Sequence, residues 1–181
     1  MQNSLIKQRT KARKLAFFIW GSFVFVALTW NFLIFLAPIA AELRAEGLAK
    51  TIYGFFSYVC HQIENRSFTF HGHKLAVCSR CFGFYFSFLV GLFIYPLFFR
   101  RFDDAEPIPP FWLIIALIPI GLDWSLGVLG FWENTHLSRF TTGFILGFTC
   151  AICITPAFSE FAFFLVLREK AYQKLKFWKI L

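Results

Sequence analysis

The chain of 181 residues is 58% hydrophobic, 22% aromatic and only 15% charged, and its formal net charge is +8. A soluble domain is about 45–50% apolar and about 25% charged, so this composition excludes a soluble globular enzyme, a disordered chain and an ordinary nucleic-acid binder. The composition instead predicts an integral membrane protein.

Four apolar stretches are long enough to cross a membrane, because about 20 helical residues span the hydrocarbon core. We expect these spans at about residues 15–41, 82–99, 108–132 and 140–167. Pro156 lies near the inner end of the fourth, where we expect a kink. The first stretch is too long for a signal peptide, so we interpret it as retained. The predicted fold is an all-α, four-helix transmembrane bundle that forms one domain over residues 1–181.

Most of the 18 Lys and Arg residues fall in the N-terminal tail, in the loop that starts at Arg100 and Arg101, and in the tail 168–181. Basic flanks stay on the cytoplasmic side, so we expect both termini in the cytoplasm, most naturally at a prokaryotic cytoplasmic membrane. Residues 42–81 then face outward. Basic tails beside spans predict contact with anionic lipid and no contact with nucleic acid. These patterns leave the oligomeric state open.

The outward segment 42–81 begins with apolar residues near the helical period, which predicts an extra helix at the outer interface. The rest of the segment contains six side chains of the types that bind metal ions: Cys60, His61, His71, His73, Cys78 and Cys81. Thiolate and imidazole are the usual zinc ligands, and a Cys-x-x-Cys spacing lets both sulfurs reach one ion. We therefore expect zinc bound by Cys60, Cys78, Cys81 and a histidine. His61 is a candidate ligand, but its adjacency to Cys60 favours His71 or His73 and leaves His61 for acid–base work.

Two other uses of these cysteines stay open. Cys60 can pair with Cys78 or Cys81 in a disulfide that staples the segment to the second span. Cys78 and Cys81 can also form a redox-active dithiol, with Arg80 lowering a thiol pKa. The pair Cys150 and Cys153 has the same spacing but lies inside the fourth span, where cysteine usually packs as a small apolar residue.

Asp123 is expected roughly 10 Å inside the third span, from a helical rise of about 1.5 Å per residue. A carboxylate at that depth needs a partner or a polar cavity, and Arg139 at the mouth of the fourth span is the expected partner. The pair is either a structural ion pair or part of an outward-opening pocket, with His61, Asp123 and Arg139 as candidate catalytic residues. Gly143 and Gly147 predict close packing of the fourth span against a neighbour.

Two blocks of residues resemble a known family. The first is Cys60-His61-Gln62, Arg66-Ser67-Phe68, Gly72, Val77-Cys78-Ser79-Arg80-Cys81 and Gly83-x-Tyr85, and the second is Pro119-x-x-x-Asp123, Asn134, Arg139 and Thr142-Gly143. Together they resemble a domain-of-unknown-function family of small predicted bacterial and archaeal membrane proteins, over roughly residues 50–150. Trp124 stands where that family commonly has glycine. The resemblance supports the choice of site and implies no substrate.

These observations predict a multi-pass membrane protein with an outward zinc site beside an Asp/Arg pocket. Metal-dependent hydrolysis or binding of a lipid-derived substrate is the expected function, with Asp123 or His61 as acid–base partner and Arg139 holding an anionic group. The alternatives are a thiol–disulfide redox protein that uses Cys78 and Cys81, and a non-catalytic membrane subunit with a disulfide-stapled outer segment. No nucleotide-binding or protease motif narrows the reaction class.

Overall fold

The computed structural model describes residues 2–98 and 108–178, which form five α-helices and one small hairpin. In chain order the elements are α1 (Gln2–Glu42), α2 (Glu46–Ser57), the 3-10 turn η1 (Glu64–Arg66), β1 (Thr69–Phe70), β2 (His73–Lys74), α3 (Ser79–Phe98), α4 (Phe111–Val128) and α5 (His136–Trp178). Helices α1, α3, α4 and α5 are long and apolar enough to cross a membrane. The predicted all-α bundle of four apolar helices with one extra helix is confirmed.

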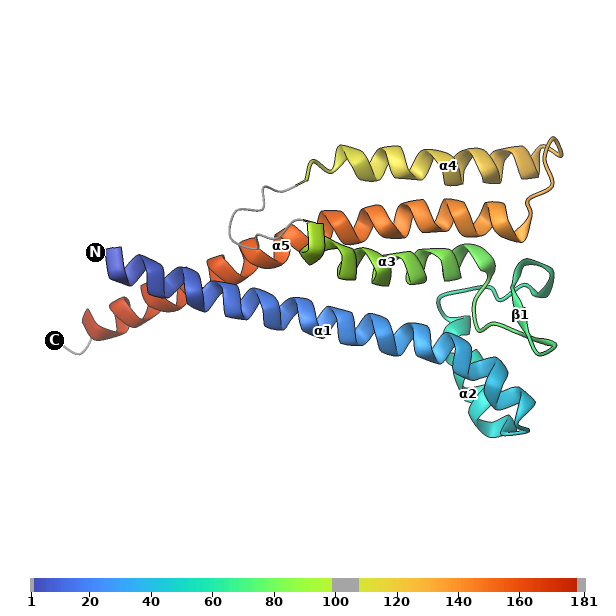
Figure 1. Cartoon of the computed structure of the whole chain (residues 1–181), viewed down its shortest axis with the longest axis horizontal. Coiled ribbons are helices and arrows are strands. Elements are labelled where there is room, and N and C mark those ends of the chain that lie inside the picture. Colours follow the sequence, from blue (N-terminus) through green and yellow to red (C-terminus); the bar gives the residue numbers. More distant parts are fainter. Residues whose placement is uncertain (1, 99–107, 179–181) are drawn as a thin grey trace.

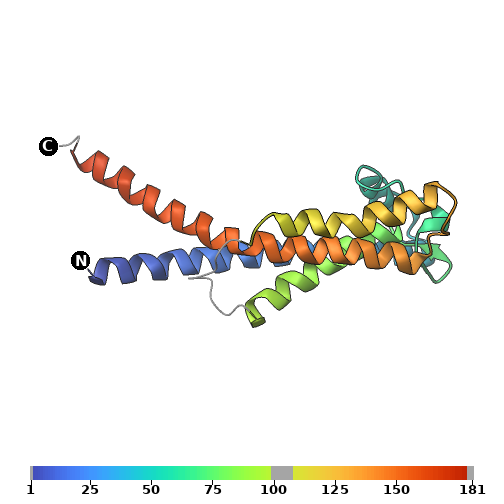
Figure 2. The same cartoon turned by 90° about the horizontal axis from the view of Figure 1, so that it is seen from above.

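Helices α4, α5 and α3 lie side by side; the N-terminal part of α1 crosses the C-terminal part of α5, and α1 then runs along α3 (Figure 1). Both chain ends lie at one end of the molecule, and α2 with the hairpin lies at the opposite end. Helix α5 bends between these two ends (Figure 2), and Pro156 inside the helix removes one backbone donor at this part. The predicted basic loop at Arg100 and Arg101 lies outside the described residues.

The helix ends differ from the predicted spans for local reasons. Helix α4 stops at Val128, four residues before the predicted end, because Gly130 adopts a positive φ of 74°. The N–H of Phe131 then returns to the carbonyl of Leu126 at 3.1 Å, which caps the helix. Helix α5 begins four residues early, at His136, since the Thr135 hydroxyl accepts a hydrogen bond from the Ser138 N–H at 3.0 Å.

Helices α3 and α5 form the closest helix pair of the bundle, and glycine makes that approach possible. A Cβ placed on Gly143 would overlap the carbonyl oxygen of Arg80, and one on Gly147 would overlap that of Phe84. From the other side, a Cβ on Gly83 would meet the carbonyl of Phe140. The close packing predicted from the small-xxx-small spacing is therefore confirmed, and α3 is the neighbour.

Helix α2 covers the C-terminal part of α1 with one apolar face. Its buried residues are Ala49, Ile52 and Phe56, which recur at helical spacing. Phe56 packs against Trp30 of α1 with ring centroids 5.2 Å apart. The core around them also includes Cys60 and residues 75–77, so this packing holds the outer segment against the bundle.

Candidate functional site

Three cysteine sulfurs from two separate segments converge at the N-terminal end of α3. Cys60 follows α2, Cys78 directly precedes α3, and Cys81 lies in its first turn. The three Sγ atoms lie within 4.8 Å of one another, and those of Cys78 and Cys81 are 3.4 Å apart. The Cys78 N–H also donates a hydrogen bond to the Cys60 sulfur at 3.2 Å. We refer to these three residues as the thiol cluster.

The thiol cluster depends on a set of hydrogen bonds that folds the outer segment back on itself. The Gln62 amide donates to the carbonyl of Tyr53 at 2.7 Å, and the Lys74 ammonium donates to the carbonyl of Gln62 at 3.0 Å. The Tyr53 hydroxyl in turn donates to the carbonyl of Lys74. Gln62 takes a positive φ of 51°, so the chain reverses directly after Cys60 and brings its sulfur to Cys78.

The thiol cluster lies in an apolar surrounding. Cys60 is only 5% exposed, and Cys78 and Cys81 are half-buried among side chains of α1, α2 and α3. Hydrogen bonding with Cys60 holds the pKa of the Cys78 thiol well below its usual range. The same contact with Cys78 raises the pKa of the Cys60 thiol. Cys78 is therefore the sulfur of this pair that carries negative charge first, and thiolate is the form that binds metal.

No histidine joins the thiol cluster among the described residues. His61 and His71 are exposed, and His73 instead faces the Glu42 carboxylate at 3.4 Å. The structure thus brings together three of the four predicted ligand side chains, and the role of His61 stays a prediction. The adjacency of His61 to Cys60 in the chain gives the physical reason, because neighbouring side chains point in different directions when one of them is buried.

The cysteines of the described residues are free thiols. The sulfurs of the thiol cluster are therefore close without a bond between them, as both a metal site and a reducible dithiol require. Cys150 and Cys153 lie apart from the cluster, half-buried within α5. Their position agrees with a packing role and makes them a useful internal comparison for the cluster.

Asp123 is paired with Arg80 rather than with Arg139, so the predicted partner was wrong. The Arg80 guanidinium donates to the Asp123 carboxylate, and the Asn134 amide donates to the same oxygen at 3.0 Å. The reason is the close approach of α3 and α5 at Gly143, which carries the start of α3 within reach of α4. Asp123 is buried, at 8% exposure, so this pair fixes α4 beside the other helices.

Arg139 belongs to a wider group of positive charges at the same end of the bundle. Its charge is repelled by those of Arg66 and Arg80 and attracted by those of Asp123 and Cys78. We refer to Arg66, Arg80 and Arg139 as the arginine cluster. Among the described residues, neither Arg66 nor Arg139 has an ion pair or a side-chain hydrogen bond.

Ser79 and His136 join the starts of α3 and α5 beside the arginine cluster. The Ser79 hydroxyl and the His136 Nδ1 atom lie 2.9 Å apart, within hydrogen-bonding distance. Sequence reasoning did not predict this contact because Ser79 and His136 are 57 positions apart in the chain. It also missed Arg80 as the partner of Asp123, although an arginine directly before an apolar span is a signal for a charge held at the membrane surface.

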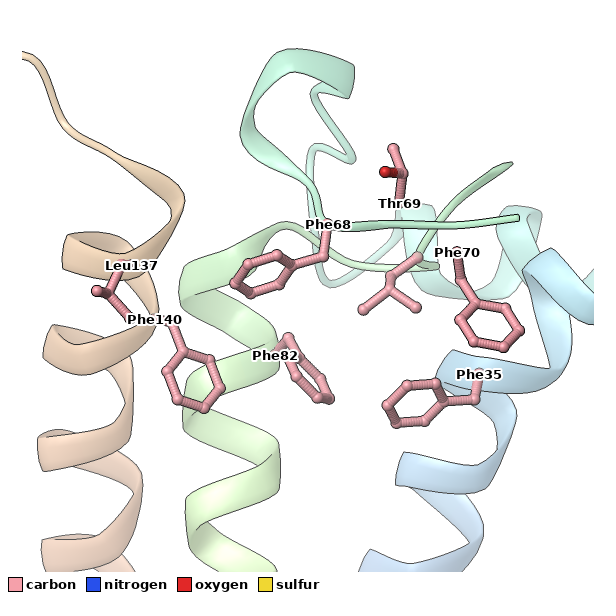
Figure 3. Close-up of a pocket in the computed structure, with 8 residues that line it drawn as sticks. Phe35, Phe68, Thr69, Phe70, Phe82, Leu137 and Phe140 are labelled. Carbon is pink, nitrogen blue, oxygen red and sulfur yellow. The ribbon is translucent and has the colours of Figure 1, made fainter. Parts of the chain in front are cut away.

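An apolar groove of about 400 Å³ lies under the hairpin, between α1, α3 and α5. Figure 3 shows Phe35 of α1, Phe82 of α3 and Phe140 of α5 pointing into it below Phe68 and Phe70. The other lining residues are Thr69, Leu75 and Leu137. We call these eight residues the aromatic groove. Its volume is within the range of about 300–1,000 Å³ that small-molecule sites occupy.

Comparison with known proteins gives relatives without an assigned activity. A family model described as "Predicted membrane protein (DUF2085)" matches residues 60–153, which include the thiol cluster. The uncharacterized protein MJ1492 of Methanocaldococcus jannaschii is 44% identical over 132 residues, which cover 70% of this chain and 84% of that protein. An uncharacterized protein of Methanothermobacter thermautotrophicus is 32% identical over 100 residues, 54% of this chain and 85% of its own. No solved structure matches the chain.

Proposed function

The chain belongs to the DUF2085 family of predicted membrane proteins, and we propose that it binds one thiophilic metal ion through Cys60, Cys78 and Cys81. The observation that carries this proposal is the convergence of three sulfurs within 4.8 Å. Around a tetrahedral zinc ion, with Zn–S bonds of about 2.3 Å, neighbouring sulfurs lie about 3.8 Å apart. The thiol cluster needs only small side-chain shifts to reach that arrangement.

We take zinc as the first candidate for the ion. Zinc accepts three thiolates and leaves a fourth position for a nitrogen ligand, a water molecule or a substrate group. Other soft ions such as Cu(I) also suit thiolates, so the metal itself has to be measured. His61, His71 and His73 are the candidate nitrogen ligands, and each requires movement of the outer segment from its present position.

An open fourth position suits Lewis-acid chemistry when zinc is bound, and we propose hydrolysis or binding of a lipid-derived substrate. His61 is exposed and therefore accessible for proton transfer. Asp123 is held by Arg80 and Asn134, so we assign it first to positioning and only second to acid–base work. Arg139, without an acidic partner in the described part of the chain, is suited to an anionic group.

Metal analysis of the full chain purified in mild detergent tests the metal site. We expect about one zinc per chain, and at least a tenfold lower content in Cys60→Ser, Cys78→Ser and Cys81→Ser, because loss of one of three thiolates removes most of the affinity. Cys150→Ser and Cys153→Ser are the matched controls. They remove half-buried thiols of the same spacing from α5 and should leave the metal content unchanged.

The absorption spectrum of the cobalt-loaded protein is a second test of metal binding by the three thiolates. Three thiolate ligands should produce intense sulfur-to-cobalt charge-transfer absorption, which each cluster variant loses and the α5 variants keep. Absence of metal together with oxidised Cys78 and Cys81 would contradict the metal site. That result would favour the redox alternative, for which the 3.4 Å distance between these two sulfurs is the supporting observation.

We also propose that both termini are cytoplasmic and that the thiol cluster faces outward. A Lys7→Cys variant and a Glu133→Cys variant place an exposed new thiol at opposite ends of the molecule. A membrane-impermeant maleimide applied to intact cells should modify the new thiol of Glu133→Cys, and should modify that of Lys7→Cys only after lysis. The parent chain, labelled in parallel, gives the background from native cysteines. The reverse labelling pattern would invert the topology.

A further inference from the structure

The aromatic groove and the arginine cluster meet at the first turn of α5. Leu137 and Phe140 line the groove, and His136 and Arg139 lie three residues apart on the adjacent face of the same turn. The His136 ring also packs on Phe68 of the groove, with ring centroids 5.5 Å apart. A ligand in the groove therefore lies beside His136 and next to the turn of α5 that carries Arg139.

The arginine cluster has more positive charge than its surroundings balance. Arg139 lies within electrostatic range of the Arg66 and Arg80 guanidinium groups, and the Asp123 carboxylate is already paired with Arg80. The Nε–H donor of Arg80 is buried without a hydrogen-bond partner. The N-terminal ends of α3 and α5 add their partial positive charge at this place. The site therefore favours an anion.

We propose that the outer face binds one anionic lipid, with its phosphate at Arg66, Arg139 and His136 and an acyl chain in the aromatic groove. Charge complementarity selects this occupant. A free phosphate would leave the groove empty, and a neutral hydrocarbon would leave the arginines unbalanced. An anionic amphiphile satisfies both parts at once. The inference specifies the lipid-derived ligand of the proposed function as a phosphate-bearing lipid, and it rests on that function for the outward orientation.

The lipid site and the metal site are separable by experiment because they use different residues. Cys60 and Cys78 pack against α1 and α2, whereas Arg80 turns toward α4. A Cys78→Ser chain without metal should therefore still bind the lipid. An Arg139→Gln chain should still bind metal. Failure of one proposal thus leaves the other standing.

The test is native mass spectrometry of the full chain in mild detergent, after equilibration with equal amounts of phosphatidylglycerol and phosphatidylcholine. We expect one retained phosphatidylglycerol, which the parent chain prefers over phosphatidylcholine. Arg139→Gln should lower that preference about fivefold, the effect expected for one basic side chain near a lipid headgroup. Arg139→Lys should restore part of it. Lys50→Gln, which removes a charge that is 82% exposed on α2, should change nothing.

A separate variant tests whether the aromatic groove holds the acyl chain. Leu137→Glu places a carboxylate at the groove from a residue that is 70% exposed, so the fold should tolerate it and lipid retention should fall. Arg66→Gln repeats the headgroup test at an exposed position if Arg139→Gln does not fold. Equal retention of both lipids, unaffected by these variants, would overturn the proposal. Displacement of the lipid by inorganic phosphate, with no effect of Leu137→Glu, would reduce the site to an anion site and also overturn it.

Discussion

Replacement of Asp123 with alanine should destabilise the bundle by about 3–5 kcal/mol, the usual cost of removing one partner of a buried ion pair. Asp123 is buried and its carboxylate accepts from both Arg80 and Asn134. Without it, the Arg80 guanidinium is left next to apolar side chains with no counter-charge. Unfolding by a graded increase of denaturing detergent, followed by tryptophan fluorescence, measures the loss.

Two comparison variants decide whether the pair itself is responsible. Arg139→Gln should cost less than about 1 kcal/mol because its charge has no acidic partner in the described part of the chain. The double variant Asp123→Asn with Arg80→Gln removes both charges and should recover part of the loss, since no unpaired ion remains. A larger effect of Arg139→Gln than of Arg80→Gln would restore the partner predicted from the sequence and contradict the structure.

Gly143→Ala and Gly147→Ala should each destabilise the bundle by about 1–3 kcal/mol, the cost of one extra carbon in a filled interface. The new methyl groups would overlap the backbone carbonyl oxygens of Arg80 and Phe84, which cannot rotate away. Helices α3 and α5 must then separate along the face that positions Arg80. The same detergent titration measures this loss.

Gly121→Ala is the matched control for these two variants. It is also a glycine within an apolar helix, but a Cβ placed there meets no atom within 4 Å beyond the neighbouring backbone of its own helix. Alanine should therefore stabilise α4 by up to about 0.5–1 kcal/mol through its better helix propensity. Equal effects at positions 121, 143 and 147 would show that helix propensity, and not the contact between α3 and α5, decides these positions.

The membrane-spanning helices could be predicted from the length of the uninterrupted apolar stretches in the sequence. A stretch such as residues 15–41 has no alternative to a membrane helix, because each backbone polar group in lipid must be bonded within the chain. The thiol cluster also followed from the sequence, since a Cys-x-x-Cys pair at a helix start fixes two sulfurs locally. The third sulfur, that of Cys60, required the chain to return over 18 positions, and the apolar face of α2 provides that return.

The polar contacts between helices did not follow from the sequence. Arg139 was a reasonable partner for Asp123 because a short connection joins the third and fourth spans. The ion pair that the structure shows, between Asp123 and Arg80, depends on how closely α3 approaches α5. Glycines at positions 83, 143 and 147 together set that distance. The contact between Ser79 and His136 depends on the same distance. The spacing of residues within one segment does not determine the distance between two helices.

The exposure of α4 has a consequence for how the protein responds to ligands. Within that helix Ala116 and Asp123 are the buried residues, and lipid tails are as apolar as the rest of its surface. Its attachment therefore depends strongly on the contact of Asp123 with Arg80 and Asn134. The phosphate of the proposed lipid lies at Arg66, Arg139 and His136, so it leaves Arg80 to Asp123 and keeps this attachment intact. An anion that displaced Asp123 from Arg80 would weaken the attachment, and by thermodynamic reciprocity displacement of α4 would strengthen the binding of that anion.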